Sequence, residues 1–216
     1  MGGIVMKKRW MKLFMAVVLM GIALPVMAVH TEAASKDVTK QMASDKDLKK
    51  VCKMMAAYTT AMNISDKATT EQTTLSLNDA NKLSIAAFVR YNYKDDFGYT
   101  KKELKAESRA LFGKAASTAV IGKNNADLLV CSADKKYAAE PFMYCGGEFG
   151  DSVPKYKITK VTRIKKNVYQ VEIDNKLGVY GEKGSELAGT TVLKVKKTKV
   201  SRYGYVVKGI TYRSAK

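Results

Sequence analysis

Hydrophobic residues in the first half of the chain recur at helical spacing. Between residues 45 and 62 they follow the i, i+3, i+4, i+7 pattern of an amphipathic helix, and the stripe consists of Leu48, Val51, Cys52, Met55, Tyr58, Thr59 and Met62. Ser44 and Asp45 precede the stripe and can accept hydrogen bonds from the first free backbone N–H groups. The pattern predicts a helix that buries this face in the core.

Two further helices are expected from capping signals. The segment 76–93 opens with Ser-x-x-Asp, a capping-box spacing, and its apolar residues fall on more than one face, which is typical of a central helix. The segment 100–113 opens with Thr-x-x-Glu and ends at a glycine in the usual position after a helix. We interpret the threonine-rich residues 63–74 as a polar connection between the first two helices.

From residue 117 onward the periodicity changes to the alternation of strands. Short apolar runs come first, at 118–121, 127–131 and 137–145. Two hairpins follow, in which turns near 165–167 and 201–204 join the strands 155–164, 168–174, 191–199 and 205–213. Within the hairpins Tyr169, Val171 and Ile173 share one face of their strand, and Thr191, Leu193 and Val195 share one face of theirs.

Helices followed by antiparallel strands predict an α+β domain. We expect three N-terminal helices packed on one face of a curved antiparallel sheet, and this order resembles the outline of the cystatin-like cone folds, which include the nuclear-transport-factor superfamily. The resemblance is one of architecture. The expected organisation is a signal peptide at 1–28, a flexible leader at 29–44, and a single domain at 45–216 with helices over about 45–113 and strands over about 117–213.

The first 28 residues have the pattern of a secretory signal peptide. Four basic residues precede an apolar run at 13–24, and Val26-x-Ala28 supplies the residues of a cleavage site. The run is shorter than the roughly 20 residues that a spanning helix needs. A retained anchor over 13–29 is the alternative, but Pro25 interrupts it, and cleavage after Ala33 is a second option. We predict a bacterial protein that is secreted or associated with the cell envelope.

Secretion brings the three cysteines into an oxidising environment. Cys131 and Cys145 each end a strand-like run, so we predict a disulfide between them and leave Cys52 as a buried free thiol. The alternative is that all three are small core residues, since free cysteine is among the most buried residue types.

The composition is strongly basic. The chain has 38 Lys and Arg against 20 Asp and Glu, and loss of the signal peptide leaves a formal net charge of +14. Only six basic residues are arginines, so the charge consists mainly of hydrated lysine ammonium groups. The predicted polyanion-binding residues lie on or beside the last strands: Lys155, Lys157, Lys165, Lys166, Lys194, Lys196, Lys197 and Lys199. The expected partner is an anionic cell-wall polymer or a surface partner, whereas nucleic acid is a poor partner for a secreted protein. The alternative is that these lysines only keep the sheet soluble.

The distribution of catalytic residue types favours a non-enzymatic protein. His30 is the only histidine and lies beside the predicted cleavage site, which excludes Ser-His-Asp and Cys-His catalytic sets and argues against a histidine-ligated metal. We therefore predict neither a cofactor nor a metal. The alternative is a small secreted hydrolase or lyase that uses carboxylates, with Glu140, Glu148 and Asp151 as candidates in a cone-shaped pocket.

Overall fold

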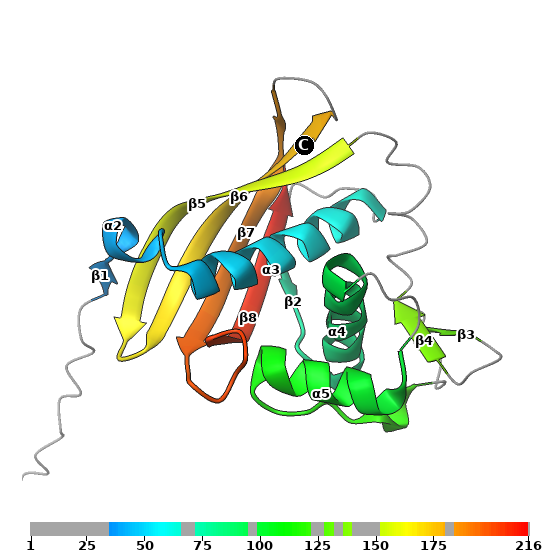
Figure 1. Ribbon diagram of the computed structural model, residues 1–216. Coiled ribbons are helices and arrows are strands. Elements are labelled where there is room, and N and C mark those ends of the chain that lie inside the picture. Colours follow the sequence, from blue (N-terminus) through cyan, green and yellow to red (C-terminus); the bar gives the residue numbers. More distant parts are fainter. Residues whose placement is uncertain are drawn as a thin grey trace, which may run out of the picture. The chain divides into compact units, whose positions relative to one another are not determined.

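The computed structural model describes residues 35–65, 72–94, 99–121, 128–131, 136–139, 152–179 and 184–215. They form an α+β structure around a six-stranded antiparallel sheet, as the order of elements predicts (Figure 1). Its strands, in spatial order, are β1 (Lys36–Asp37), β5 (Ser152–Lys165), β6 (Val168–Val179), β7 (Glu186–Lys197), β8 (Tyr205–Ser214) and β2 (Thr73–Leu75). The remaining strands, β3 (Leu128–Cys131) and β4 (Lys136–Ala139), pair with each other.

The longest helix, α3 (Lys46–Ser65), lies across one face of the large sheet (Figure 1). Its first turn is capped by Asp45, whose Oδ1 accepts a hydrogen bond of 3.0 Å from the N–H of Leu48. The apolar stripe that the sequence predicts is buried from Leu48 to Thr59 and packs against β5, β6, β7 and β8. The predicted helix and its cap are therefore confirmed.

The helix α5 (Lys101–Phe112) has the ends that the sequence predicts. Thr100 Oγ1 accepts from the N–H of Glu103, and Glu103 Oε2 accepts from the N–H of Thr100 at 2.9 Å, which completes the capping box. Gly113 ends the helix with φ at 79°, a left-handed conformation that glycine adopts without steric cost. The helix packs against β8 and against α4.

The central helix, α4 (Asp79–Lys94), begins three residues later than predicted. The side chain of Asn78 accepts from the N–H of Asn81 at 2.8 Å, so Asn78 caps the helix in place of Ser76. Residues 83–89 are buried on all sides, as expected for a central helix. The helix packs against α3, α5 and the small β3–β4 sheet.

Part of the predicted leader is ordered on the sheet. Residues 36–42 form β1 and the short helix α2 (Thr39–Met42), and Val38 is buried. The N–H of Val38 donates to the carbonyl oxygen of Val161, and the N–H of Val161 donates to Thr39 Oγ1, both at 2.8 Å. The predicted flexible leader is therefore wrong for these residues, because two hydrogen bonds and one buried apolar side chain hold them on the sheet. A single apolar residue in a polar segment is too weak a signal to predict this from the sequence. Residues 29–34 lie outside the described part.

Two short elements also differ from the prediction. The expected strand 118–121 is a 3-10 turn at Thr118–Val120, where Ser117 Oγ accepts from the N–H of Ala119. The strand β2 falls in the segment interpreted as a polar connection and pairs with residues 210–212 of β8. At 118–120 local capping by the side chain of Ser117 outweighs the strand preference of the residues. At 73–75 pairing with the distant strand β8 outweighs their preference for a loop.

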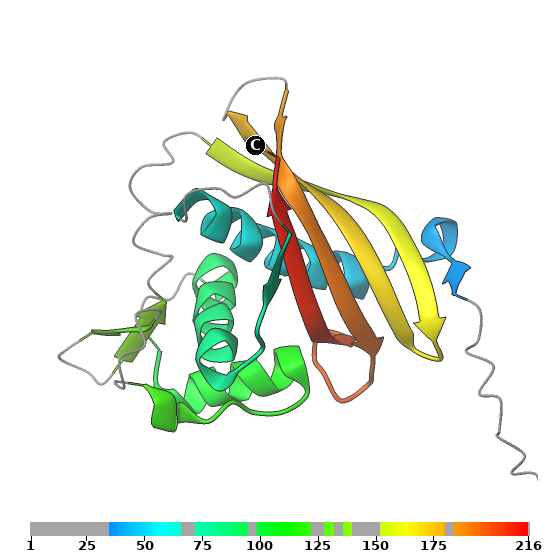
Figure 2. The same cartoon turned by 180° about the vertical axis from the view of Figure 1, so that it is seen from behind.

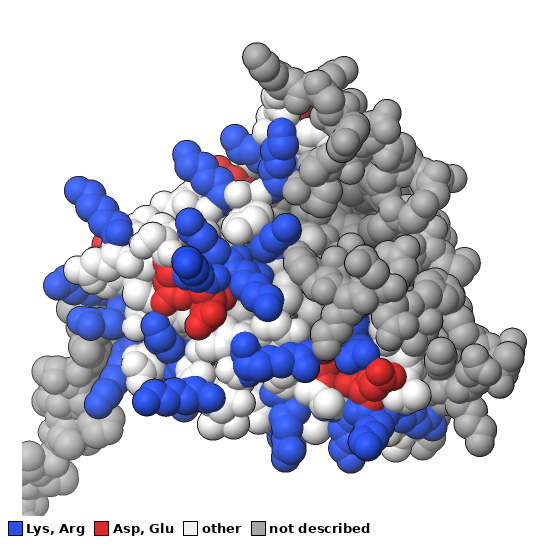
Figure 3. All heavy atoms as spheres, viewed as in Figure 1, with Lys and Arg blue, Asp and Glu red and all other residues white. Residues whose placement is uncertain are grey.

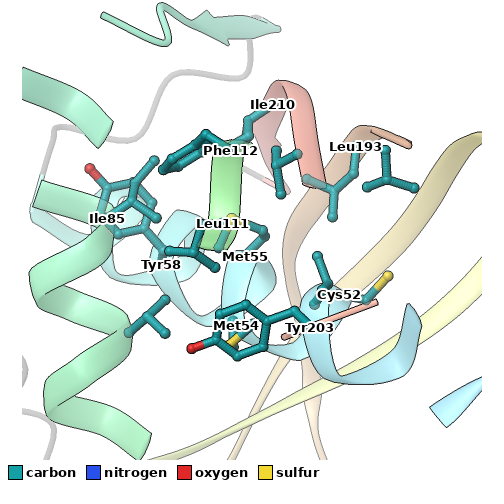
Figure 4. Packing of buried hydrophobic residues seen from close by; sticks show 14 of the residues in the cluster. Cys52, Met54, Met55, Tyr58, Ile85, Leu111, Phe112, Leu193, Tyr203 and Ile210 are labelled. Atoms are coloured by element: carbon teal, nitrogen blue, oxygen red, sulfur yellow. The ribbon is translucent and has the colours of Figure 1, made fainter. Parts of the chain in front are cut away.

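The core lies between α3 and the sheet and continues between α3, α4 and α5 (Figure 4). The shared faces predicted for both hairpins are confirmed and point toward the core. Tyr169 is partly buried there, and the buried residues are Val171, Ile173, Thr191, Leu193 and Val195. Cys52 is a free, fully buried cysteine. The side chain of Cys131 and all of Cys145 lie outside the described residues, so the disulfide between them stays a prediction.

Candidate functional site

We call the face of the sheet that points away from α3 the outer face (Figure 2). The antiparallel register places residues of neighbouring strands side by side in rows. One row is Lys160, Glu172, Val192 and Thr211, and the next is Lys157, Asp174, Thr190 and Arg213. Among the described helices, none packs against the outer face of β6 and β7. Within these rows Lys157, Lys160 and Arg213 are exposed, and the other five residues are half-buried.

The outer face has a strong excess of positive charge. Its basic residues are Lys155, Lys157, Lys160, Lys165, Lys176, Lys194, Lys196 and Arg213. On these four strands its acidic residues are Glu172 and Asp174. Eight cations against two carboxylates give the outer face of β5 to β8 a formal charge of +6, and Asp37 on the edge strand β1, opposite Thr162, adds a third carboxylate. Such a surface attracts polyanions at short range.

A β-bulge brings one of these lysines to the outer face. The register shifts between Ile158 and Lys160, so that Ile158 and Val161 both pack toward the core although they are three positions apart, an odd number. Lys160 then lies opposite Glu172, and their Nζ and Oε1 atoms are 3.8 Å apart. Strict alternation along β5 would place Lys155 and Lys157 on this face but not Lys160, and Lys160 is not among the eight predicted polyanion-binding residues.

The eight lysines predicted to bind polyanions do not form one surface. Five of them lie on the outer face: Lys155, Lys157, Lys165, Lys194 and Lys196. Lys166 is exposed in the turn between β5 and β6, and Lys199 is exposed in the loop between β7 and β8. Lys197 lies on the side of α3, where its Nζ is 2.9 Å from Asp45 Oδ2. Lys197 therefore serves the helix cap rather than the outer face.

Asp45 connects the start of α3 to the sheet through three hydrogen bonds. It accepts from the N–H of Leu48, from Lys197 Nζ and from the hydroxyl of Tyr205, the last two at 2.9 Å. Burial disfavours the carboxylate, but these bonds outweigh burial and lower the pKa of Asp45. The pKa of Lys197 is raised, mainly by its hydrogen bond to Asp45. Burial and the same carboxylate raise the pKa of Tyr205.

A hollow of about 200 Å³ opens on the outer face around Glu172 and Asp174. Glu172 and Asp174 lie on one side of it, Thr190 and Val192 lie in the middle on β7, and Arg213 lies on β8. Short β-branched side chains on the middle strand leave this space between the longer side chains on the two flanking strands. The hollow brings hydrogen-bond acceptors, a guanidinium and hydroxyl groups together at one place.

A second charged group is buried between α4, α5 and the loop after β7, and we call it the Glu107 cluster. The side chain of Glu107 has no solvent exposure and accepts hydrogen bonds from Arg202 Nη2 and from the hydroxyl of Tyr203, the latter at 2.5 Å. Arg90 Nη1 is 3.9 Å from Glu107 Oε2, and Arg90 Nη2 is 2.8 Å from Glu103 Oε1. Burial and the nearby carboxylate raise the pKa of Tyr203 to about 12.

The sequence did contain a signal for Glu107. It stands within the stripe of α5 formed by Leu104, Ser108 and Leu111, and these three residues are buried. A carboxylate at such a position needs partners, because an unpaired buried charge is costly. Its partners Arg202 and Tyr203 are 95 and 96 residues away in the sequence, which is why the stripe alone did not identify them.

A neutral polar group lies in the core between α3 and the sheet. Asn175 Nδ2 donates to Thr191 Oγ1 at 2.8 Å and to Thr59 Oγ1 at 3.2 Å, and the two hydroxyl oxygens are 2.7 Å apart. All three side chains are buried. Within the described part of the chain, Asn175 Oδ1 has no hydrogen-bond partner. The group links α3 to β6 and β7.

Basic side chains also cover the opposite side of the molecule. Figure 3 shows lysines and arginines over α3 and α5, with acidic side chains in a few places between them. Exposed lysines there include Lys46, Lys49, Lys102 and Lys105. Positive charge alone therefore does not distinguish the outer face. What distinguishes it is the grid of neighbouring strands and the hollow with two carboxylates.

The remaining predicted groups lie elsewhere. Glu140, Glu148 and Asp151, the carboxylates considered for catalysis, lie outside the described residues. Within the described ranges no group of three or more His, Cys, Asp or Glu residues is placed to hold a metal ion. None of the described helices combines the length and apolar character needed to cross a membrane.

Comparison with known proteins found no match: no family model, no curated protein and no solved structure is significantly similar to this chain.

Proposed function

We propose that this chain is a secreted or cell-envelope-associated, non-enzymatic protein that binds an anionic envelope polymer through the outer face of its sheet. The observation that supports the proposal is the formal charge of +6 on an exposed grid of four neighbouring strands. Lysines on adjacent strands can contact several acidic groups of one polymer at the same time. Each contact is weak, but the contacts add when they occur on one chain.

The architecture fits this role. The helix α3 packs against β5, β6, β7 and β8 and leaves their other face exposed in the described part. We also propose the cystatin-like cone outline for this chain, with its three helices on one face of a curved antiparallel sheet. The carboxylate-dependent hydrolase or lyase stays the alternative, and its candidate residues lie outside the described part.

The binding proposal is tested with two matched triple variants of protein purified from cells that express the full chain. The variant Lys157→Gln, Lys194→Gln, Lys196→Gln removes three charges from the outer face. The control variant Lys49→Gln, Lys102→Gln, Lys105→Gln removes three exposed charges from α3 and α5. Purified wall teichoic acid is the probe, and affinity is measured by isothermal titration calorimetry.

We expect the outer-face variant to bind at least about tenfold more weakly and the control to lose about twofold or less. The wild-type affinity should fall as salt rises, because salt screens exposed charges. Equal losses in the two variants would show that only net charge matters and would contradict a role for the outer face.

Secretion is tested separately with the full chain. We expect the mature protein in the medium or the wall fraction, with Val29 as its N-terminal residue in protein sequencing. A product that keeps Met1 and stays inside the cell would overturn the secretion proposal.

A further inference from the structure

The hollow on the outer face is where two carboxylates lie among the basic residues. Glu172 and Asp174 are the only carboxylates that β5, β6, β7 and β8 place on the outer face in the described part of the chain, and both line the hollow. The third carboxylate of this face, Asp37 on the edge strand β1, accepts hydrogen bonds from Thr39. A surface selected only to attract polyanions gains nothing from two carboxylates at its centre, since like charges repel. Their position calls for a ligand group other than an anion.

The shape of the hollow suits one small polar unit. Its volume of about 200 Å³ is far above the roughly 10–15 Å³ that a cavity needs to hold one water molecule. Pockets for drug-sized ligands are larger, about 300–1,000 Å³. The hollow is open to solvent on the side away from the core, so a unit of a longer chain can enter while its neighbours lie along the surface.

The residues around the hollow supply hydrogen-bond partners of both kinds. Glu172 and Asp174 accept, Arg213 donates, and the hydroxyl of Thr190 can do either. Glu172 already has one partner within the chain, because Lys160 Nζ lies 3.8 Å from Glu172 Oε1. The Glu172 side chain nevertheless keeps 38% of its surface exposed. Adjacent hydroxyl groups, which both donate and accept, match this set of partners.

The surrounding charges further limit the chemical groups that the hollow can bind. An anionic group inside the hollow would face two carboxylates, and a free cation would have to approach through eight basic side chains. A neutral unit rich in hydroxyls meets neither obstacle. If that unit belongs to an acidic chain, the neighbouring acidic groups reach Lys157, Lys160 and Lys194 around it.

We propose that the hollow is a sugar subsite for an acidic polysaccharide. The hydroxyls of one sugar unit donate hydrogen bonds to Glu172 and Asp174 and accept from Arg213, while the acidic groups of the polymer contact the lysines around the hollow. This assignment rests on the proposed function of the outer face and names the class of polymer that the face takes.

The test uses a variant for which two models predict opposite changes in affinity: general attraction of polyanions, and hydrogen bonding of sugar hydroxyls by the two carboxylates. Glu172→Gln with Asp174→Asn removes two negative charges. If the carboxylates only repel, every polyanion binds this variant more tightly. If they hold sugar hydroxyls, an acidic polysaccharide binds more weakly. The probes are polygalacturonate, alginate and hyaluronate, with polyphosphate as a polyanion that contains no sugar.

We expect at least one of the three polysaccharides to bind the double variant about tenfold more weakly, since hydrogen bonds to charged groups are lost. Polyphosphate should bind it equally or more tightly. The matched control, Asp79→Asn with Glu186→Gln, removes two negative charges away from the hollow and should bind all four probes equally or more tightly.

A second variant guards against a folding defect and adds no charge. Thr190→Val has nearly the same shape and removes one hydroxyl, so polysaccharide binding should weaken several-fold and polyphosphate binding should not change. If each of the three polysaccharides binds the double variant at least as tightly as it binds the wild type, the sugar subsite is wrong and the general polyanion site stands. If the wild type binds none of the four probes, both proposals are wrong.

Discussion

The chain uses carboxylates in two opposite ways, and the Glu107 cluster and the hollow on the outer face show the difference. Glu107 has no solvent exposure, and two arginines and a tyrosine hydroxyl surround it. Glu172 keeps 38% of its side chain exposed and has one lysine nitrogen at 3.8 Å. The first carboxylate is committed to partners within the chain, whereas the second keeps oxygen atoms available for a ligand.

Burial decides which role a carboxylate takes. A charge that has left water must find hydrogen bonds and counter-charges inside the protein, because leaving it unpaired costs several kcal/mol. A charge at the surface is hydrated already, so an ion pair there contributes about 0–1 kcal/mol and can be exchanged for a ligand. The Glu107 cluster is therefore a structural joint between α5 and the loop after β7, whereas the hollow is the site that we propose for ligand recognition.

The strongest test of this contrast makes the same substitution at both places. We expect Glu107→Gln to lower the free energy of unfolding by about 3 kcal/mol, since it leaves Arg202 and the largely buried Arg90 without their shared counter-charge. Glu172→Gln should change it by no more than about 0.5 kcal/mol. Urea denaturation followed by circular dichroism measures both. Similar losses at the two positions would show that burial does not separate their roles.

Salt should separate the two regions as well. Raising the ionic strength from roughly 0.05 to 0.5 M shortens the Debye length from about 14 Å to about 4 Å, which screens exposed charges and leaves buried pairs nearly unaffected. We expect polymer binding to the outer face to weaken by about tenfold or more, while the urea midpoint of the protein changes little. A midpoint that falls in parallel with binding would indicate that the Glu107 cluster is accessible to solvent ions.

The third test removes one hydroxyl from the buried cluster. Burial and the carboxylate of Glu107 raise the pKa of Tyr203 from 10.0 to about 12. Because the folded protein holds this proton more tightly than the unfolded chain, stability from Tyr203 is complete below about pH 10 and declines as the pH rises toward about 12.

We expect Tyr203→Phe to cost about 1 kcal/mol at neutral pH through the lost hydrogen bond to Glu107. The difference from wild type should shrink between pH values of about 10 and 12, because the wild type loses this contribution there. Urea unfolding at a series of pH values measures the difference. A difference that stays constant over this range would show that the phenol does not titrate with folding.

Local signals in the sequence were sufficient wherever one element decides its own structure. The capping box of Thr100 and Glu103 and the left-handed Gly113 were predicted from residue types alone. The inward faces of β6 and β7 followed from alternation, because a strand in a sheet with one covered face alternates with period two. These features depend on neighbours within a few residues.

Long-range features were outside the reach of such signals. Lys197 is separated by 152 residues from Asp45, and alternation along β7 places it on the face of Val195 without identifying its partner. The bulge at Ile158 to Lys160 shifts the outer face by one residue, and it depends on the register with β6. The hollow needs three strands in register, so Glu172 and Asp174 looked like ordinary solvated residues in the sequence.

The smallest expected effect concerns a pair that lies between the two extremes. The side chains of Asp45 and Lys197 are 18% and 48% exposed. This pair is therefore less buried than Glu107 with its partners and less exposed than Glu172 with Lys160. Asp45→Asn keeps a cap for α3 but loses the charge that Lys197 and Tyr205 contact, and we expect a loss of about 1 kcal/mol at neutral pH.

The sign of the pH dependence checks this intermediate case. Because hydrogen bonds to Leu48, Lys197 and Tyr205 outweigh burial and lower the pKa of Asp45 below 3.8, its charge stabilises the fold above about pH 4, and that contribution is lost as the pH falls below this value. The difference between wild type and Asp45→Asn should therefore shrink toward low pH. The control Asp79→Asn, at an exposed position of α4, should show little difference at either pH. A larger loss of stability for Asp79→Asn than for Asp45→Asn would mean that partial burial adds nothing to an ion pair in this protein. It would contradict the relation that we propose, in which more buried carboxylates contribute more to stability.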